Sequence, residues 1–173
     1  MKKLSKTLFL LGFLFAILGS IAFAKDEIIS KYEGLGYTSS KEAITKFENK
    51  YKHLIFADTK LIANAPFKIT HNFGSYQLKD EFLTLEYLNV DSNSLFKVMV
   101  FPEKNAIPLS SQEQIGAFSD GSNYSYMQED DFLIFRFSTS NYAYVLSTNH
   151  FVRESRLGIR YFTNLAESIK KSE

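Results

Sequence analysis

The sequence contains no cysteine and no tryptophan, and its 173 residues include only three prolines and eight glycines. The absence of cysteine excludes a disulfide framework, a cysteine nucleophile and thiolate metal sites. The scarcity of proline and glycine excludes a collagen-like or linker-like chain. Hydrophobic residues make up 45% and aromatic residues 16% of the sequence. This composition is typical of a globular protein with a packed core and not of a disordered chain.

The first 24 residues have the pattern of an export signal. Three lysines among the first six residues are followed by an uncharged apolar run over residues 8–21, and Ala22-Phe23-Ala24 places small residues where a signal peptidase cleaves. We therefore expect a signal peptide over residues 1–24, cleaved after Ala24. The alternative is an uncleaved membrane anchor, because the apolar run is about as short as a spanning helix can be.

Cleavage after Ala24 would leave about 150 residues, a length that suits one domain. The formal net charge of +1 would fall to −2, because three lysines are removed. We expect no nucleic-acid partner, since no basic excess remains. No cysteine is present for lipid attachment, so the expected location is secreted or extracytoplasmic, with membrane contact only through the signal segment if it is uncleaved. The abundance of lysine and asparagine is typical of a bacterial protein.

The mature chain begins with a polar stretch and then shows a helical pattern. Residues 25–38 contain Gly34 and Gly36 and are expected to form a flexible N-terminal arm. Ser39 and Glu42 have the spacing of a capping box. Ile44, Phe47 and Tyr51 follow at helical spacing, which predicts an amphipathic helix over residues 40–52. Residues 39–173 are expected to form a single α+β domain.

The remaining sequence is dominated by apolar alternation with a period of two, interrupted by turn residues. Three turns are predicted, at residues 91–94, at Asp120-Gly121 and at residues 138–141. Helices at both ends of a run of antiparallel hairpins predict an α+β fold, with an antiparallel sheet and the N-terminal and C-terminal helices packed on one face. The expected strands cover residues 54–56, 66–69, 82–90, 95–101, 115–118, 123–127, 132–137, 142–146 and 157–162, and Asn164 is expected to cap the final helix.

Two of these strands are apolar on both faces, which is unusual for a strand that has one face in water. The second face of residues 95–101 and 132–137 is therefore expected to be covered, by the N-terminal arm or by curling of the sheet, or to form a hydrophobic groove or a self-association surface. In the groove hypothesis two cations lie at the rim of an apolar floor and attract an anionic amphiphile. The candidate ligand-binding residues are Lys97, Met99, Phe101, Phe132, Ile134 and Arg136.

Motifs for catalysis and cofactor binding are scarce. The sequence has no G-x-S-x-G, H-E-x-x-H or P-loop motif, and its three histidines are far apart in sequence. The acidic residues 129–131 and the alternating tyrosines at 124, 126, 142 and 144 could bind a cation or a glycan, but turn acids and cross-strand aromatic pairs explain them as well. We therefore assign no catalytic residue, no metal site and no cofactor.

Three stretches of the chain resemble one known family. They are residues 65–69 followed by 83–88, residues 132–137 followed by 142–146, and the closing segment 164–170. The chain resembles the small extracytoplasmic domain of unknown function of Bacillus-type and Clostridium-type exported proteins, which is often attached to sporulation-related or anti-sigma-factor-like membrane proteins. The resemblance implies a curved sheet over helices, distantly similar to lipoprotein carriers, and no established catalytic residues.

These observations favour a secreted, non-enzymatic binding domain of the bacterial cell envelope. The expected ligand is apolar or amphiphilic: a lipid, an extended peptide or a strand of an envelope protein. One alternative is a structural or protein-interaction module without a small ligand. The other is a cell-envelope hydrolase whose residues come together only in the fold.

Overall fold

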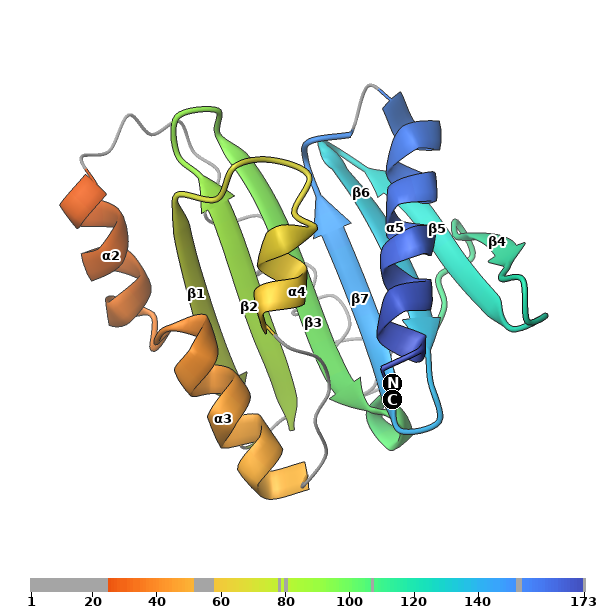
Figure 1. Cartoon of the computed structure of the whole chain (residues 1–173), viewed down its shortest axis with the longest axis horizontal. Coiled ribbons are helices and arrows are strands. Elements are labelled where there is room, and N and C mark those ends of the chain that lie inside the picture. Colours follow the sequence, from red (N-terminus) through yellow and green to blue (C-terminus); the bar gives the residue numbers. More distant parts are fainter. Residues whose placement is uncertain are drawn as a thin grey trace. The chain divides into compact units, whose positions relative to one another are not determined.

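The computed structural model describes residues 25–51, 58–77, 79, 81–106, 108–151 and 154–172. It has the predicted α+β fold, with one seven-stranded antiparallel sheet and helices (Figure 1). The elements are α2 (Lys25–Gly34), α3 (Ser40–Tyr51), α4 (Asp58–Ala63), β1 (His71–Gln77), β2 (Phe82–Asn89), β3 (Ser94–Pro102), η1 (Glu103–Asn105), β4 (Gln114–Ala117), β5 (Asn123–Glu129), β6 (Phe132–Ser138), β7 (Tyr142–Thr148) and α5 (Ser155–Lys170).

The chain divides after Leu35 into two compact units. In the first, the described residues form helix α2 within the stretch expected to be a flexible arm. Residues 25–34 lack a strong apolar stripe, so their pattern does not predict a helix. The second unit begins at Gly36 and contains all the other described elements. The expected signal peptide and the expected short strand at residues 54–56 lie outside the described residues.

Helix α3 forms where the capping pattern predicts it. The Ser39 hydroxyl accepts a hydrogen bond from the Glu42 backbone N–H at 3.2 Å, and the Glu42 carboxylate forms an ion pair with Lys46 one turn later, at 2.7 Å. Ile44 and Phe47 are buried, as expected for the apolar face of an amphipathic helix.

The sheet consists of two meanders that meet at β3 and β7. The strand order is β1-β2-β3-β7-β6-β5-β4, and every neighbouring pair is antiparallel. The predicted hairpins β2–β3, β4–β5 and β6–β7 are all present. The pairing of β3 with β7 joins residues 40 to 52 positions apart in sequence, so the connection from η1 to β4 has to cross the sheet.

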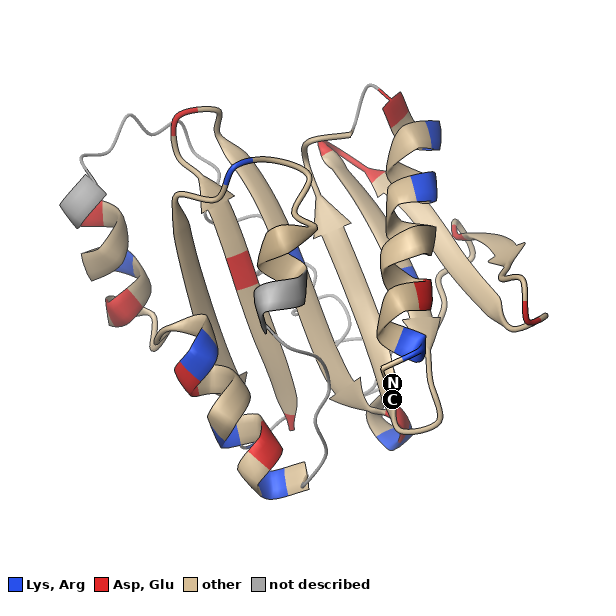
Figure 2. Ribbon diagram, in the orientation of Figure 1, with Lys and Arg blue, Asp and Glu red and all other residues tan. Residues whose placement is uncertain are grey.

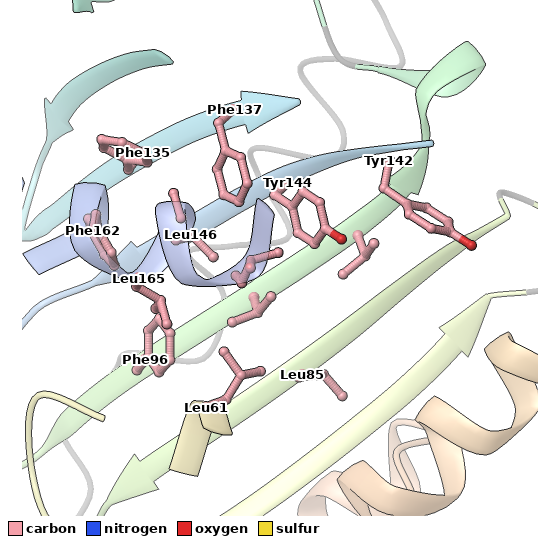
Figure 3. Close-up of a cluster of buried hydrophobic side chains, with 14 of the residues drawn as sticks. Leu61, Leu85, Phe96, Phe135, Phe137, Tyr142, Tyr144, Leu146, Phe162 and Leu165 are labelled. Atoms are coloured by element: carbon pink, nitrogen blue, oxygen red, sulfur yellow. The ribbon is translucent and has the colours of Figure 1, made fainter. Parts of the chain in front are cut away.

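One face of the sheet carries the main core. Leu85 of β2, Val98 of β3 and Leu146 of β7 lie opposite one another in register and are fully buried. Helices α3, α4 and α5 cover this face with Phe47, Leu61 and Phe162 among other side chains. Figure 3 shows the aromatic and aliphatic side chains of β6, β7 and α5 gathered in this layer.

The C-terminal helix begins earlier than the sequence analysis expected. Residues 157–162 were predicted as a strand and Asn164 as a helix cap, and both predictions are wrong, because helix α5 extends continuously from Ser155 to Lys170. Gly158, Phe162 and Ile169 are buried against the core at helical spacing. The local apolar run at residues 157–162 resembles strand alternation, but the helical period becomes clear only over the full 16 residues.

The predicted strand at residues 66–69 is also wrong, because the first strand of the sheet begins at His71. Phe67 and Ile69 instead pack against the core as single side chains. The sequence of β1 contains Gly74, which weakens its strand signal. Glycine is required there because a Cβ atom would lie 2.6 Å from the Cβ of Ala43 in α3.

Charged residues lie mainly on the helices and turns and are rare in the strands (Figure 2). No helix among the described residues is long and apolar enough to cross a membrane.

Candidate binding pocket on the sheet face opposite the core helices

The strand register determines where the six candidate residues lie. Met99 of β3 pairs with Val145 of β7, which in turn pairs with Arg136 of β6. Because side chains alternate along a strand, Lys97 and Phe101 share the face of Met99, and Phe132 and Ile134 share the face of Arg136. All six residues therefore lie on the sheet face opposite the one that α3, α4 and α5 cover.

The four apolar candidates are almost fully buried. Met99 is 6% exposed, Phe101 4%, Phe132 2% and Ile134 3%. Phe132 and Ile134 form a small apolar cluster with Met127, and Leu95 and Val145 pack against it. The groove hypothesis is therefore corrected: most of this apolar floor is covered, as the alternative interpretation of the second face proposed.

A pocket of about 490 Å³ remains on this face, and we call it the sheet-face pocket. Phe101 and Arg136 are the two candidate residues that line it, and Lys97, Met99, Phe132 and Ile134 are not among its lining. The strands also contribute Ala143 and Val145, and the crossing connection contributes Pro108 and Leu109. Its lining is predominantly apolar.

Two apolar side chains at the pocket are strongly exposed: Leu109 is 58% and Ile115 is 66% exposed. Neither residue is among the six candidates from the sequence. Leu109 lies in the loop between the strands expected at residues 95–101 and 115–118, and Ile115 was expected at the start of the second of these strands. The signal that could have identified the site is the occurrence of apolar residues in this loop, where solvated polar residues are the usual composition.

Arg136 is neutralised by a buried carboxylate. Its Nη1 lies 3.2 Å from Oε1 of Glu113, whose side chain is only 1% exposed. Oε2 of Glu113 accepts a hydrogen bond from the Ser125 hydroxyl at 2.5 Å, and Oε1 accepts one from the Ser110 backbone N–H at 2.9 Å. The guanidinium Nε of Arg136 is buried and has no hydrogen-bond partner in the described part of the chain.

Lys97 is neutralised in the same way by the strand opposite. Its Nζ lies 2.9 Å from Oε1 of Glu86, its register partner on β2, and the Glu86 side chain is 3% exposed. The Tyr37 hydroxyl donates a hydrogen bond to the same oxygen at 3.0 Å. Burial first, and the Glu86 carboxylate second, hold the pKa of the Tyr37 hydroxyl well above its ordinary value.

These ion pairs correct the expected role of the two cations. In the groove hypothesis, Lys97 and Arg136 were to attract an anionic head group. Each positive charge instead has a buried carboxylate within hydrogen-bonding distance. Each pair sums to zero charge, so neither cation offers an unpaired positive charge to an anionic head group.

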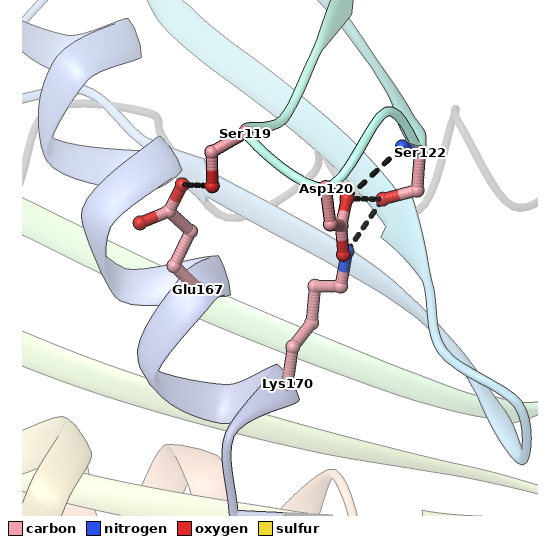
Figure 4. Close-up of polar contacts among 5 residues, drawn as sticks. All are labelled: Ser119, Asp120, Ser122, Glu167 and Lys170. Carbon is pink, nitrogen blue, oxygen red and sulfur yellow. Dashed lines mark hydrogen bonds and ion pairs between the residues drawn. The ribbon is translucent and has the colours of Figure 1, made fainter.

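A second polar cluster joins the β4–β5 turn to the end of α5 (Figure 4). The Lys170 ammonium group donates hydrogen bonds to Oδ2 of Asp120, at 2.6 Å, and to the Ser122 hydroxyl. The Ser122 hydroxyl donates to Oδ1 of Asp120 at 2.6 Å. The bond from Lys170 first, and those from Ser122 second, hold the pKa of Asp120 well below its ordinary value.

The composition of this cluster resembles a serine–lysine catalytic pair, but its geometry fits a structural role. A lysine acts as a general base only when it is neutral. Lys170 instead forms an ion pair with the Asp120 carboxylate at 2.6 Å and links the end of α5 to the β4–β5 turn. Positive φ at Gly121 allows the tight turn that brings these groups together.

Other candidate chemistry from the sequence receives a structural explanation. Tyr142 and Tyr144 are buried in the core, and Tyr144 stacks on Phe137 with ring centroids 4.7 Å apart, so they present no ladder for a glycan. No group of three histidine, aspartate or glutamate side chains with the geometry of a metal site occurs in the described ranges.

Comparison of the chain with known protein families, curated proteins and solved structures finds no match. The resemblance to the exported extracytoplasmic domain therefore stays a prediction.

Proposed function

We propose that this protein is a secreted, non-enzymatic binding domain of the bacterial cell envelope and that it binds an uncharged apolar group in the sheet-face pocket. The observation that supports the proposal is the pocket itself, about 490 Å³ in volume and bordered by two strongly exposed apolar residues, Leu109 and Ile115. Its volume lies within the range of ordinary small-ligand sites, and its lining is mainly apolar, as in such sites.

The charges around the pocket favour a neutral ligand. Glu113 neutralises Arg136 beside the pocket, and Glu86 neutralises Lys97 on the same face. An alkyl chain or an apolar side chain gains binding free energy by leaving water, at about 25 cal/mol per Å² of buried apolar surface. A carboxylate or phosphate would lose its hydration and gain no free cation in exchange.

The experiment is a titration of the protein with alkyl glucosides of increasing chain length, monitored by calorimetry below their micelle concentrations. Fatty acids of the same chain lengths serve as the charged comparison. We expect affinity for the glucosides to rise with chain length until the pocket is full and then to level off. The matched fatty acids are expected to bind more weakly.

Two tryptophan substitutions test whether binding occurs in the pocket. Ala143 lines the pocket, so Ala143→Trp fills it and is expected to abolish glucoside binding. Ala63 is exposed at the end of α4, so Ala63→Trp adds the same side chain elsewhere and should leave binding unchanged. Equal loss in both variants, or no saturable binding by the wild-type protein, would contradict the proposal.

One alternative has support in the structure. The burial of Met99, Phe132 and Ile134 favours a structural or interaction module whose second sheet face is simply a second core layer. In that case the titration would show no chain-length dependence, and Ala143→Trp would change only stability.

A further inference from the structure

The sheet has one edge that ends at a short, exposed strand. β4 is the last strand in the sheet order and has only four residues. It pairs with β5 and with no other strand in the described part of the chain. At the opposite edge β1 is partly covered, because Thr38 and Gly74 exchange two backbone hydrogen bonds.

The hydrogen-bonding pattern shows which backbone groups of β4 point away from the sheet. The Phe118 N–H donates to the Ser122 carbonyl, just beyond the end of the β4–β5 ladder. Hydrogen-bonded and non-hydrogen-bonded pairs alternate in an antiparallel ladder, so Gly116 bonds to Tyr124 on β5. Ile115 and Ala117 then direct their N–H and C=O groups outward.

The β6–β7 hairpin leads to the same assignment. The Thr139 N–H donates to the Tyr142 carbonyl, so alternation makes Phe137 and Tyr144 a hydrogen-bonded pair. The backbone groups of Phe137 then point to β7 and away from β5. Its partner on β5, Tyr124, must therefore bond to Gly116 on β4.

The side chains of β4 offer little protection against strand addition. Natural edge strands are often blocked by lysine or proline, and the sequence Gln-Ile-Gly-Ala contains neither. Ile115 pairs with Ser125, which pairs with Arg136, so Ile115 lies on the same face as the sheet-face pocket. Ile115 belongs to the edge strand and also lines the pocket, so the pocket lies directly beside the open edge. Leu109 and Ile115 are the exposed apolar side chains of its lining.

We propose that the β4 edge binds an extended, uncharged peptide segment of a partner protein as an added strand, with one apolar side chain of that segment in the sheet-face pocket. The inference rests on the proposed function and specifies its ligand class. Backbone hydrogen bonds to Ile115 and Ala117 would supply affinity, and the pocket would select apolar side chains at alternate positions of the peptide. Because Glu86 and Glu113 pair with the two cations of this sheet face, we expect the bound segment to be uncharged beside the pocket.

The probe is a library of random seven-residue peptides with blocked ends. Peptides that bind the protein are selected and then synthesised with a fluorophore. We expect selected peptides to alternate apolar and uncharged polar residues. Each selected peptide is then made in two N-methylated forms, at odd or at even positions. Strand addition predicts that one form binds at least about tenfold more weakly and that the other keeps its affinity, because only alternate amides face β4.

Substitutions at Ala117 test the protein side. Ala117→Pro removes one outward N–H and is expected to weaken peptide binding about fivefold to tenfold. Ala117→Val keeps the N–H and serves as the control. Hydrogen exchange gives a second measurement: peptide should slow exchange at Ile115 and Ala117, whereas Gly116, already bonded to β5, should change little.

The outcomes separate the inference from the proposed function. If alkyl glucosides bind the pocket but no peptide is selected, or if both N-methylated forms bind equally, strand addition is wrong and the pocket proposal stands. If neither probe binds, both are wrong. If Ile115 and Ala117 become protected with rising protein concentration and no peptide, the occupant is a second copy of the chain and the peptide inference fails.

Discussion

At the scale of single residues, the candidate site depends on two buried carboxylates. Alternation within the strands predicted that Lys97 and Arg136 lie with the apolar candidates on a second sheet face. Alternation could not predict their partners. The β2–β3 register places Glu86 opposite Lys97, and the path of the crossing connection places Glu113 beside Arg136. The sequence therefore predicted the cations of the site but not its neutrality.

The Arg136–Glu113 pair is expected to be costly to break on one side. Arg136→Ala leaves the Glu113 carboxylate buried without its cation and should lower the free energy of unfolding by about 3–5 kcal/mol in urea denaturation. The double variant Arg136→Met with Glu113→Gln removes both charges and should recover most of this loss. Arg160→Ala, at an exposed position of α5, should cost less than about 1 kcal/mol. Equal losses in the single and double variants would show that charge burial is not the cause.

At the scale of elements, local signals predicted the hairpins and longer-range packing determined the rest. Asp120-Gly121 and residues 91–94 carry turn residues whose chemistry acts within four positions, so the corresponding hairpins were predicted correctly. Strand β1 was missed because Gly74 weakens its pattern, and the start of α5 was missed because residues 157–162 alternate locally. In both cases contacts with distant elements decide the structure: Ala43 of α3 against Gly74, and Leu133 of β6 against Gly158.

Helix α3 should contribute strongly to stability through one aromatic side chain. Phe47 is fully buried and contacts Tyr51, Tyr76 and Tyr142. Phe47→Ala is expected to lower the free energy of unfolding by about 3–5 kcal/mol, because it leaves a cavity in the core. Lys46→Ala, on the exposed side of the same helix, should cost at most about 0.5 kcal/mol. A loss below about 1 kcal/mol for Phe47→Ala would mean that α3 is not part of the core.

Glu81, just before β2, connects helices α3 and η1 and should make stability depend on pH. Its carboxylate accepts hydrogen bonds from Lys50 of α3 and from Lys104 and Asn105 of η1. The bond from Lys50 first, then those from Lys104 and Asn105, lower the pKa of Glu81 from 4.5 to about 2. Because the folded pKa lies below the unfolded value, the stabilisation is complete above pH 4.5 and is lost as the pH falls toward 2.

The variant Glu81→Gln isolates this contribution. Compared with the wild-type protein, it should be less stable at about pH 6 and nearly equal in stability at about pH 2, as measured by urea unfolding at both pH values. Glu103→Gln, at an exposed carboxylate of η1, is the matched control and should change stability less at about pH 6. A stability difference for Glu81→Gln that is the same at both pH values would contradict the assignment.

At the scale of the whole molecule, the fold class follows from the sequence but the strand order does not. A helix, a run of antiparallel hairpins and a final helix predict an α+β sheet. The pairing of β3 with β7 depends on contacts between distant segments, and no local signal encodes it. The sheet-face pocket forms only because this pairing places Phe101, Val145 and Arg136 together under the crossing connection.

Export should leave a mature protein that begins at Lys25. Ala22-Phe23-Ala24 followed by a charged stretch is typical of a cleaved signal peptide. N-terminal sequencing of the protein recovered from a secreting bacterial host tests this expectation, and an Ala24→Arg variant, which blocks the cleavage site, is the control. Recovery of the intact wild-type chain from salt-washed membranes would instead identify residues 1–24 as an anchor.

Binding of an uncharged apolar group in the sheet-face pocket can be followed at individual side chains. The most direct test is a methyl-labelled NMR titration of the mature protein with decyl glucoside below its micelle concentration. We expect saturable shifts of the methyl groups that line the pocket, those of Leu109, Ile115, Ala143 and Val145. We expect no change at Leu85 and Leu165, which lie in the core under the helices. Shifts confined to the helical face, or no saturable shift in any pocket methyl group, would contradict the proposed binding.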